Sequence, residues 1–329
     1  MPSSQSEREG EAPPGFAGGG GDVSPYQWPQ SKRPITEKQK IFFGRNGMPE
    51  IPDLEATKSV LDARVIGCAV QAVSVHKPFV IRSLTGEEIQ VALPDQTVTA
   101  VHRRGKYLIF RFDRHSLVVN PMLTGRFQLC KPETRRSAET IFTVSLSSGE
   151  DLRYLDGKNM GMAYLVRDEE YGAIPRFTDQ GPDALDPDLT LEMFRTRLKP
   201  LHGEIKGILT NARFIAGIGN AYADEILFSA GIYPFRRRKS LTEDEIQKLF
   251  RSIKEVLQES IAVVKERMGD NIHLKIRDFL KVHGKAGSAC PRCGGRIASV
   301  KARQRETNFC RRCQPGLLVE PQIRFSVKK

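Results

Sequence analysis

Four of the six cysteines form two Cys-x-x-Cys pairs, Cys290 with Cys293 and Cys310 with Cys313. The sixteen residues between the pairs suffice for a hairpin that brings four thiolates together as a tetrahedral zinc site. Four thiolates close the coordination sphere, which predicts one structural Zn²⁺ and no zinc-bound catalytic water. Residues 286–315 are too few and too rich in Gly, Arg and Cys to fold by burial alone, so we predict a zinc ribbon there.

The cations between the two cysteine pairs include Lys301, Arg303 and Arg305. On a metal-braced hairpin such side chains could enter a groove of a nucleic acid and hold phosphates. A solvated charged face is the alternative. The nearby His283 is interpreted as an ordinary surface histidine.

A glycine turn at residues 217–220 (Gly-Ile-Gly-Asn) precedes a predicted helix that carries Asp224 and Glu225 in its first turns. Backbone N–H groups at a helix start can bind phosphate, and Asn220 would add a side-chain amide donor. A tight turn between two helices with no ligand is an equally good interpretation of this motif alone.

Residues 48–180 show the pattern of a β-rich domain that begins with a short helix. Pro52 and Asp53 suit a first helical turn, whereas residues 142–147 alternate apolar and polar side chains before the Ser148-Gly149 turn. Repeated strands of this kind predict an antiparallel β-sandwich.

Residues 181–285 change to a period of about 3.6, which predicts a helical domain. Its clearest helix opens with Thr242 and Glu245 as a capping box. The apolar stripe along that helix consists of Ile246, Leu249, Ile253, Leu257 and Val264.

Composition narrows the class of partner. The 329 residues include 51 Lys plus Arg against 39 Asp plus Glu, a net charge of +12 that favours nucleic acid over an anionic membrane surface. We find no apolar stretch that could span a bilayer and no signal-peptide pattern, which predicts a cytoplasmic, nucleoid-associated protein. Residues 1–47 are predicted to be disordered, residues 316–329 carry no interpretation, and Cys68 and Cys130 are interpreted as buried free thiols.

Four motifs in order resemble the formamidopyrimidine-DNA glycosylase/endonuclease VIII family, over Met48 to about Gln314. They are residues 48–55 (MPEIPDLE), residues 103–107 (RRGKY), Lys206 with residues 217–225, and residues 305–310 (RETNFC). The resemblance implies an α+β multidomain protein with an N-terminal antiparallel β-sandwich, a helix-two-turn-helix domain and a four-cysteine zinc ribbon. It also implies a monomeric base-excision repair enzyme, a glycosylase and abasic-site lyase that removes oxidised bases from damaged double-stranded DNA.

The resemblance assigns the chemistry to the residues after Met48. With Met48 removed, the secondary amine of Pro49 attacks the sugar C1′, expels the base and leaves an iminium that allows elimination of the flanking phosphates. An N-terminal amine has a pKa near ~8, so part of it is unprotonated at neutral pH. Glu50 protonates the sugar ring oxygen and shuttles protons during elimination. Lys106 belongs with these catalytic groups and holds a phosphate of the flipped nucleotide.

DNA contacts are implied in the same way. Asn220 and Arg305 hold phosphates, and Lys206 lies near the damaged base. The wedge that fills the gap left by the flipped base departs from the family pattern, since this chain has Leu123 in Asn-Pro-Met-Leu-Thr-Gly and Lys158-Asn-Met160. Leu123 and Met160 are apolar enough to fill the gap, and Lys158 could contact the orphaned base.

Two further departures bear on activity. Residues 1–47 would acylate the nitrogen of Pro49, and an amide nitrogen cannot form an iminium, so we expect translation to start at Met48 or processing to expose Pro49. Residues 269–283 form a short segment compared with family members that fold a long loop over 8-oxoguanine. This length predicts weak excision of 8-oxoguanine, with ring-opened purines such as formamidopyrimidine or oxidised pyrimidines preferred.

Two other functions stay open. A non-catalytic protein that binds damaged or distorted DNA would keep the fold without the amine, and a zinc-ribbon RNA-binding protein would need only the basic hairpin. The second gives no reason for the motif at residues 48–55. Covalent chemistry at Pro49 separates the enzyme from both alternatives.

Overall fold

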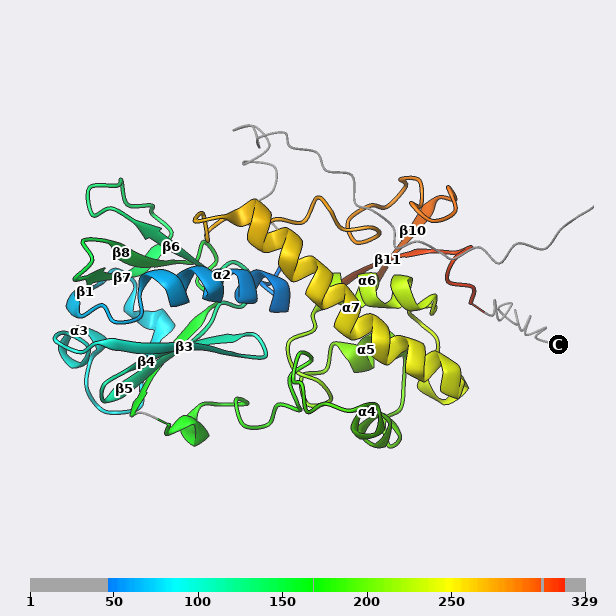
Figure 1. Cartoon of the computed structure of the whole chain (residues 1–329), viewed down its shortest axis with the longest axis horizontal. Coiled ribbons are helices and arrows are strands. Elements are labelled where there is room, and N and C mark those ends of the chain that lie inside the picture. Colours follow the sequence, from blue (N-terminus) through cyan, green and yellow to red (C-terminus); the bar gives the residue numbers. More distant parts are fainter. Residues whose placement is uncertain (1–46, 168, 303–304, 317–329) are drawn as a thin grey trace, which may run out of the picture. The chain divides into compact units, whose positions relative to one another are not determined.

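The computed structural model describes residues 47–167, 169–302 and 305–316. Two sheets follow the first described helix, with strand orders β1-β7-β8-β6 and β2-β9-β5-β4-β3 (Figure 1). Their strands are β1 (Val70–Val75), β2 (Ile81–Ser83), β3 (Val98–Arg104), β4 (Tyr107–Phe112), β5 (His115–Asn120), β6 (Arg126–Cys130), β7 (Thr140–Leu146), β8 (Asp151–Leu155) and β9 (Met162–Arg167). Short helical turns are η1 (Pro78–Val80), α3 (Ile89–Ala92) and η2 (Tyr171–Ala173).

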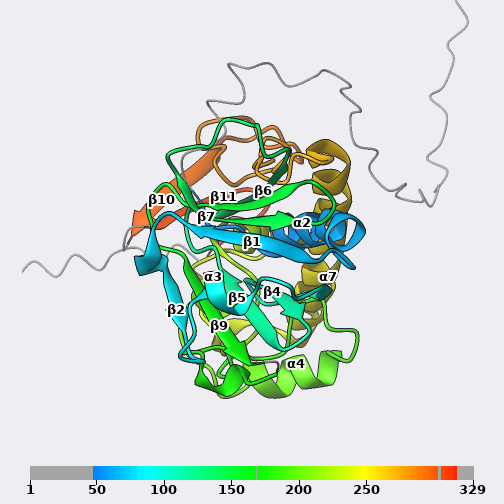
Figure 2. The same cartoon turned by 90° about the vertical axis from the view of Figure 1, so that its left-hand side faces the viewer.

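The two sheets lie face to face (Figure 2), and aromatic side chains from both meet between them. The rings of Phe110 on β4 and Phe127 on β6 lie 5.1 Å apart, and Tyr154 on β8 lies 5.2 Å from Phe127. These contacts confirm the predicted sandwich. The prediction that every strand of the sandwich is antiparallel was wrong at one edge. The three-residue strand β2 pairs in parallel with β9. A strand added to the edge from elsewhere in the chain needs no hairpin and can therefore run in either direction.

The helix α2 (Ile51–Arg64) connects the sandwich to the helical part of the chain. Pro52 stands in its first turn, and the Asp53 carboxylate accepts a hydrogen bond of 2.8 Å from the Glu50 N–H, which satisfies a donor at the helix start. Ile51 and Leu61 are fully buried. The helix packs against β3 on one side and against α7 on the other, so the predicted short helix is a fourteen-residue core element (Figure 1).

The helical part contains α4 (Leu191–Leu198), α5 (Ile205–Leu209), α6 (Asn220–Ala230), η3 (Arg238–Ser240) and α7 (Glu243–Met268). The predicted capping box is present, since Glu245 N–H donates to Thr242 Oγ1 and the Glu245 carboxylate accepts from Thr242 N–H. Of the predicted stripe only Ile246 is not fully buried. Among the described residues, no helix has the length and apolar composition needed to cross a membrane.

The last described element is a hairpin of β10 (Ile297–Ala302) and β11 (Arg305–Cys310). Ile297 packs in a small apolar cluster with Phe228 of α6 and with Val282. The hairpin is therefore seated on α6 rather than held by its metal site alone.

The two isolated cysteines are more exposed than the sequence suggested. Cys68 and Cys130 are free but only partly buried, so their interpretation as buried thiols was wrong. Both lie near strand ends, where one side of the residue meets solvent. The predicted disorder of residues 1–47 falls, apart from Gly47, outside the described residues, as does most of the tail 316–329.

Candidate active site

The carboxylate of Glu50 lies at the start of helix α6. Its two oxygens accept hydrogen bonds from the backbone N–H groups of Gly219 (2.7 Å), Ala221 (3.0 Å) and Tyr222 (3.2 Å). Glu50 is only 3% exposed. A residue that belongs to the sandwich thus occupies the positive end of a helix in the other part of the chain.

The glycine turn makes this contact sterically feasible. An ideal Cβ on Gly219 would lie 2.4 Å from Cδ of Glu50, and one on Gly217 would lie 2.3 Å from Cδ1 of Ile51. Gly217 also has φ +98°, a conformation that favours glycine. The N–H groups that the sequence suggested for a phosphate therefore bind Glu50 instead.

Charge around Glu50 keeps its carboxyl ionised. Burial would raise the pKa of this group. The cations Arg277 and Lys106, together with the N–H of Ala221, outweigh burial, so the pKa lies below its ordinary value. An ionised carboxylate in this position accepts protons and does not begin as an acid.

Lys106 stands in the two-residue turn between β3 and β4. Gly105 precedes it with φ +57°, as a hairpin turn with glycine first requires. Burial lowers the pKa of Lys106, and Arg277 lowers it further while Glu50 opposes both. The cation therefore lies in the same electrostatic environment as the Glu50 carboxylate.

Arg103 fixes this turn to the helical part. Its guanidinium donates to both carboxylate oxygens of Asp183 (2.6 and 2.7 Å) and to the Gly105 carbonyl (2.9 Å). Asp183 also accepts from the Gly105 N–H at 2.8 Å, and Glu55 pairs with the same arginine. A bidentate pair of this kind sets direction as well as distance, so it orients the turn that carries Lys106.

Pro49 is buried and lines a hollow beside α2. Asp53, Arg126 and Lys275 line the same hollow, and the Lys275 ammonium donates to the Gly47 carbonyl at 2.8 Å. Burial lowers the pKa of Lys275 to about 8. The nitrogen of Pro49 thus adjoins an environment that disfavours added positive charge.

Arg277 completes the hollow's surroundings. It forms an ion pair with Asp53 and stacks over the Tyr222 ring, with its guanidinium carbon 4.6 Å from the ring centre. Its Nε and Nη1 are buried, and no atom of the described residues accepts a hydrogen bond from either. Neither Arg277 nor Lys275 was predicted from the sequence, because they stand in an irregular segment where no periodic pattern marks an inward-facing side chain.

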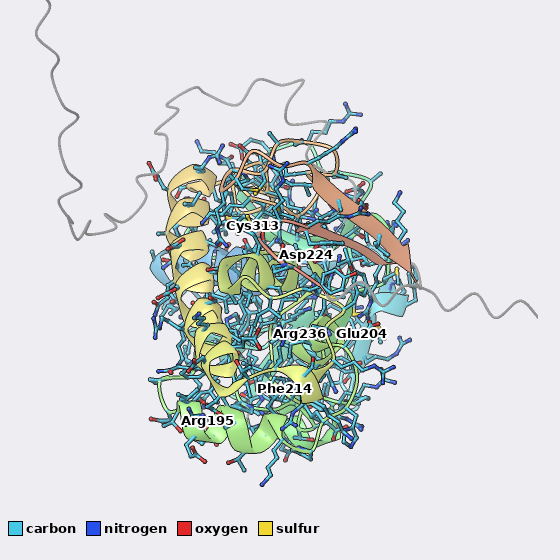
Figure 3. All side chains as sticks on the ribbon, turned by 90° about the vertical axis from the view of Figure 1, so that its right-hand side faces the viewer. Arg195, Glu204, Phe214, Asp224, Arg236 and Cys313 are labelled. Carbon is cyan, nitrogen blue, oxygen red and sulfur yellow. The ribbon has the colours of Figure 1, made fainter. Side chains whose placement is uncertain are left out.

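Lys206 is buried beneath the ribbon. Its ammonium pairs with Asp224 (2.7 Å) and donates to Thr307 Oγ1 (2.8 Å) and to the Glu306 carbonyl (3.2 Å). Asn220 donates to the same carbonyl at 2.8 Å. Both predicted residues thus hold strand β11 against α5 and α6; the Asp224 that pairs with Lys206 is labelled in Figure 3.

Asp224 also has the His283 side chain as a neighbour. Its Oδ2 lies 2.8 Å from Nδ1 of His283, whose side chain is 25% exposed, so the interpretation of His283 as an ordinary surface residue was wrong. The adjacent Glu225 accepts from the N–H groups of Lys281 (2.8 Å), Val282 (2.9 Å) and His283 (2.8 Å). Two neighbouring acids of α6 thereby anchor the end of the segment that carries Arg277.

The four ribbon sulfurs have the geometry of a zinc site. The Sγ atoms of Cys290 and Cys313 lie 3.8 Å apart, those of Cys293 and Cys310 lie 3.5 Å apart, and all four lie within 4.8 Å of one another. A tetrahedral ion with Zn–S bonds of about 2.3 Å requires S–S edges of about 3.8 Å. The four cysteines therefore fit one structural Zn²⁺, as predicted.

The remaining predicted DNA contacts fall into two groups. Arg305 is exposed at the start of β11, and its charge acts on both Lys106 and Lys206, which places it with the Glu50 group. Leu123, Lys158 and Met160 belong to two loops at one end of the sandwich. Met160 is 44% exposed, Lys158 is exposed and Leu123 is partly buried.

Three segments of the chain match the domains of one class of DNA-repair enzyme. Residues 48–163 match the N-terminal domain of formamidopyrimidine-DNA glycosylase, residues 180–271 match the H2TH domain of that enzyme, and residues 287–316 match the zinc finger found in FPG and IleRS. Sandwich, helical module and ribbon thus define a DNA glycosylase of the helix-two-turn-helix class.

Relatives identify the family. The formamidopyrimidine-DNA glycosylase of Symbiobacterium thermophilum is 34% identical over 287 residues, which cover 84% of this chain and 93% of that protein. The one of Pelotomaculum thermopropionicum is 34% identical over 273 residues, 81% of this chain and 99% of that protein. The chain belongs to the formamidopyrimidine-DNA glycosylase family, as the sequence motifs predicted.

Solved structures agree with this assignment. Lactococcus lactis Fpg in complex with DNA containing an abasic site is 30% identical and superposes with a TM-score of 0.74, covering 82% of this chain and 100% of that chain. The same values hold for Lactococcus lactis Fpg with DNA containing N7-benzyl-Fapy-dG. The predicted fold is therefore confirmed.

Proposed function

We propose that this protein is a base-excision repair glycosylase and abasic-site lyase that removes oxidised bases from duplex DNA through an iminium on Pro49. The sandwich (48–180), the helical domain (181–285) and the ribbon (286–315) would together enclose the damaged duplex. The family's relatives support the reaction class, and the net charge of +12 suits a polyanionic partner.

The observation that carries the proposal is the buried, ionised carboxylate of Glu50, the residue that follows Pro49 in the chain, held among cations at the start of α6. The Pro49 nitrogen attacks C1′, and the base leaves with the electrons of the glycosidic bond. Glu50, which begins as a carboxylate, takes the proton from that nitrogen and passes it to the sugar ring oxygen. The C1′–O bond then breaks as the iminium forms, and Glu50 is again a carboxylate.

The surrounding cations favour the reactive form of the amine. Lys275, Arg126 and Arg277 lie around the hollow that Pro49 lines, and positive charge disfavours protonation of a neighbouring amine. More Pro49 amine is then neutral at a given pH. The same cations stabilise the phosphates that leave during elimination.

The proposed DNA contacts divide by position. Lys106, Asn220 and Arg305 hold phosphates around the flipped nucleotide, and Lys206 supports the ribbon close to the damaged base. Leu123, Met160 and Lys158 occupy the gap left by that base. Zinc supplies no step of this reaction, since four thiolates complete its coordination and its part is to hold the ribbon.

The test is reductive trapping with sodium borohydride on a duplex that contains an abasic site. Protein that starts at Met48, with the methionine removed, should give a covalent adduct that maps to Pro49, because reduction fixes the iminium. The 1–329 chain, in which the Pro49 nitrogen is an amide, should not form that adduct. Glu50→Gln in the shorter protein should slow trapping by ~100-fold.

Absence of an adduct in both forms, with duplex binding intact, would replace this proposal with the second candidate, a DNA-damage binder without chemistry. We also expect ring-opened purines or oxidised pyrimidines to be excised faster than 8-oxoguanine, given the short segment 269–283. Equal single-turnover rates on formamidopyrimidine and 8-oxoguanine duplexes would contradict that preference.

A further inference from the structure

The two loops that carry the proposed wedge residues both cross from one sheet to the other. Residues 121–125 connect β5 to β6, and residues 156–161 connect β8 to β9. Because β5 pairs with β9 and β6 pairs with β8, the crossings occur at the same end of the sandwich. Two separate loops therefore present Leu123, Lys158 and Met160.

One buried carboxylate connects the loops. Asp156 is 0% exposed, and its Oδ1 accepts from the Thr124 hydroxyl and from the Lys158 N–H (3.1 Å). Its Oδ2 accepts from the Gly161 N–H at 2.6 Å. The Lys158 N–H also lies 3.1 Å from the Thr124 oxygen, so the hydroxyl both donates across the gap and accepts from it.

The atoms around the Asp156 carboxylate are closely packed. The Tyr154 hydroxyl would lie 2.2 Å from a Cβ on Gly125 and 2.0 Å from one on Gly161, so both loops lie directly on the tyrosine. Met122 and Asn159 have φ of +47° and +53°. Asparagine adopts this conformation readily, but a methionine holds it only where the surroundings fix it.

We infer that the bond from Thr124 to Asp156 is a positioning element that makes the two loops act as one rigid wedge when a nucleotide is flipped. Neither residue is among the described side chains that line the hollow at Pro49. A carboxylate is needed because three donors meet its two oxygens, whereas the amide of an asparagine has only one acceptor oxygen. This inference rests on the proposed function, since it assigns the loops to the displaced strand.

The experiment measures wedge insertion without requiring catalysis. The 1–329 chain is mixed with a duplex that contains a tetrahydrofuran abasic analogue opposite 2-aminopurine, whose fluorescence rises when it is unstacked. Thr124→Val removes the hydroxyl at nearly constant volume and should slow the fluorescence rise by about tenfold, the loss of one hydrogen bond to a charged group. Thr124→Ser retains the hydroxyl and should stay within twofold of the wild type.

Two comparisons separate positioning from general damage to the fold. Ser137→Ala removes another loop hydroxyl of the sandwich, one that accepts from the Glu139 N–H, and should leave insertion unchanged. For Thr124→Val, binding to an undamaged duplex should stay within twofold, because no base is displaced there. Should Thr124→Val not fold, Asp156→Asn replaces it and is expected to slow insertion at least as much.

The inference is overturned if Thr124→Val inserts as fast as Thr124→Ser, or if its binding to damaged and undamaged duplexes falls equally. Either result could coexist with normal trapping at Pro49, in which case the proposed function stands and only the positioning role fails. If no adduct forms at Pro49 although the wild type inserts its wedge and Thr124→Val slows insertion, the proposed lyase function fails and the positioning role stands.

Discussion

Substitution of Gly219 by alanine tests the central contact of the site. The new Cβ would lie 2.4 Å from Cδ of Glu50 and 2.7 Å from each carboxylate oxygen. Ordinary contacts of such atoms are about 3.5 Å or more, so the carboxylate must retreat by about 1 Å. Its three hydrogen bonds, now 2.7 to 3.2 Å long, would then exceed bonding distance.

The cost follows from these contacts. Overpacking of a rigid site destabilises by about 1–3 kcal/mol, and one hydrogen bond to a charged group contributes about 1.5–3 kcal/mol. The carboxylate either stays and overlaps the new methyl group or moves and loses hydrogen bonds, so the two costs do not add in full. We therefore expect Gly219→Ala to lower the free energy of unfolding by about 2–4 kcal/mol. For a chain of this size, with an unfolding entropy of about 2.1 cal/mol/K per residue, that lowers the Tm by about 3–6 °C. Excision should slow by about 100-fold, since the proton acceptor is displaced.

The matched control is Gly207→Ala in helix α5, where a Cβ meets no atom within 4 Å. Alanine there should leave excision unchanged and stabilise by about 0.5–1 kcal/mol. Thermal unfolding followed by circular dichroism and single-turnover excision, both on the protein that starts at Met48, measure the two effects. If the two alanine variants have equal Tm and equal rates, the carboxylate is not held as described.

Three further results are expected. Burial lowers the pKa of Lys275 from 10.5 to about 8, so between these values the unfolded chain binds a proton that the folded chain does not, and stability rises with pH. In the 1–329 chain, Lys275→Met should therefore be more stable than wild type at pH 7.5, by at most about 3 kcal/mol, and lose that advantage by pH 10.5; a pH-independent difference in urea unfolding would contradict this. Removal of zinc by a chelator should release one ion per chain and weaken duplex binding by at least ~10-fold, and unchanged binding by metal-free protein would exclude a role for the ribbon. Arg103→Lys cannot make the two bonds to Asp183, and should lower stability by about 2–3 kcal/mol in denaturant unfolding, unless the turn at Lys106 is held by other means.

Local patterns in the sequence were sufficient wherever the deciding interaction is short in range. The cysteine spacing predicted the zinc site, and Thr242 with Glu245 predicted the start of α7. In both cases the residues of a pair are only a few positions apart, so the local backbone sets their relative geometry. Period-two alternation predicted the sandwich in the same way. The family motifs added the assignment of Pro49 and Glu50 to one site, which no periodicity implies.

Tertiary structure alone decided which polar groups meet. The Glu50 carboxylate and the Gly219 N–H are 169 residues apart, and an acidic residue at a helix start has the same sequence pattern whether it caps its own helix or another. For that reason the glycine turn suggested a phosphate site, although its N–H groups bind Glu50. Arg277 and the link between Thr124 and Asp156 were invisible for the same physical reason: burial and charge pairing across loops depend on how distant segments pack, which local sequence does not encode.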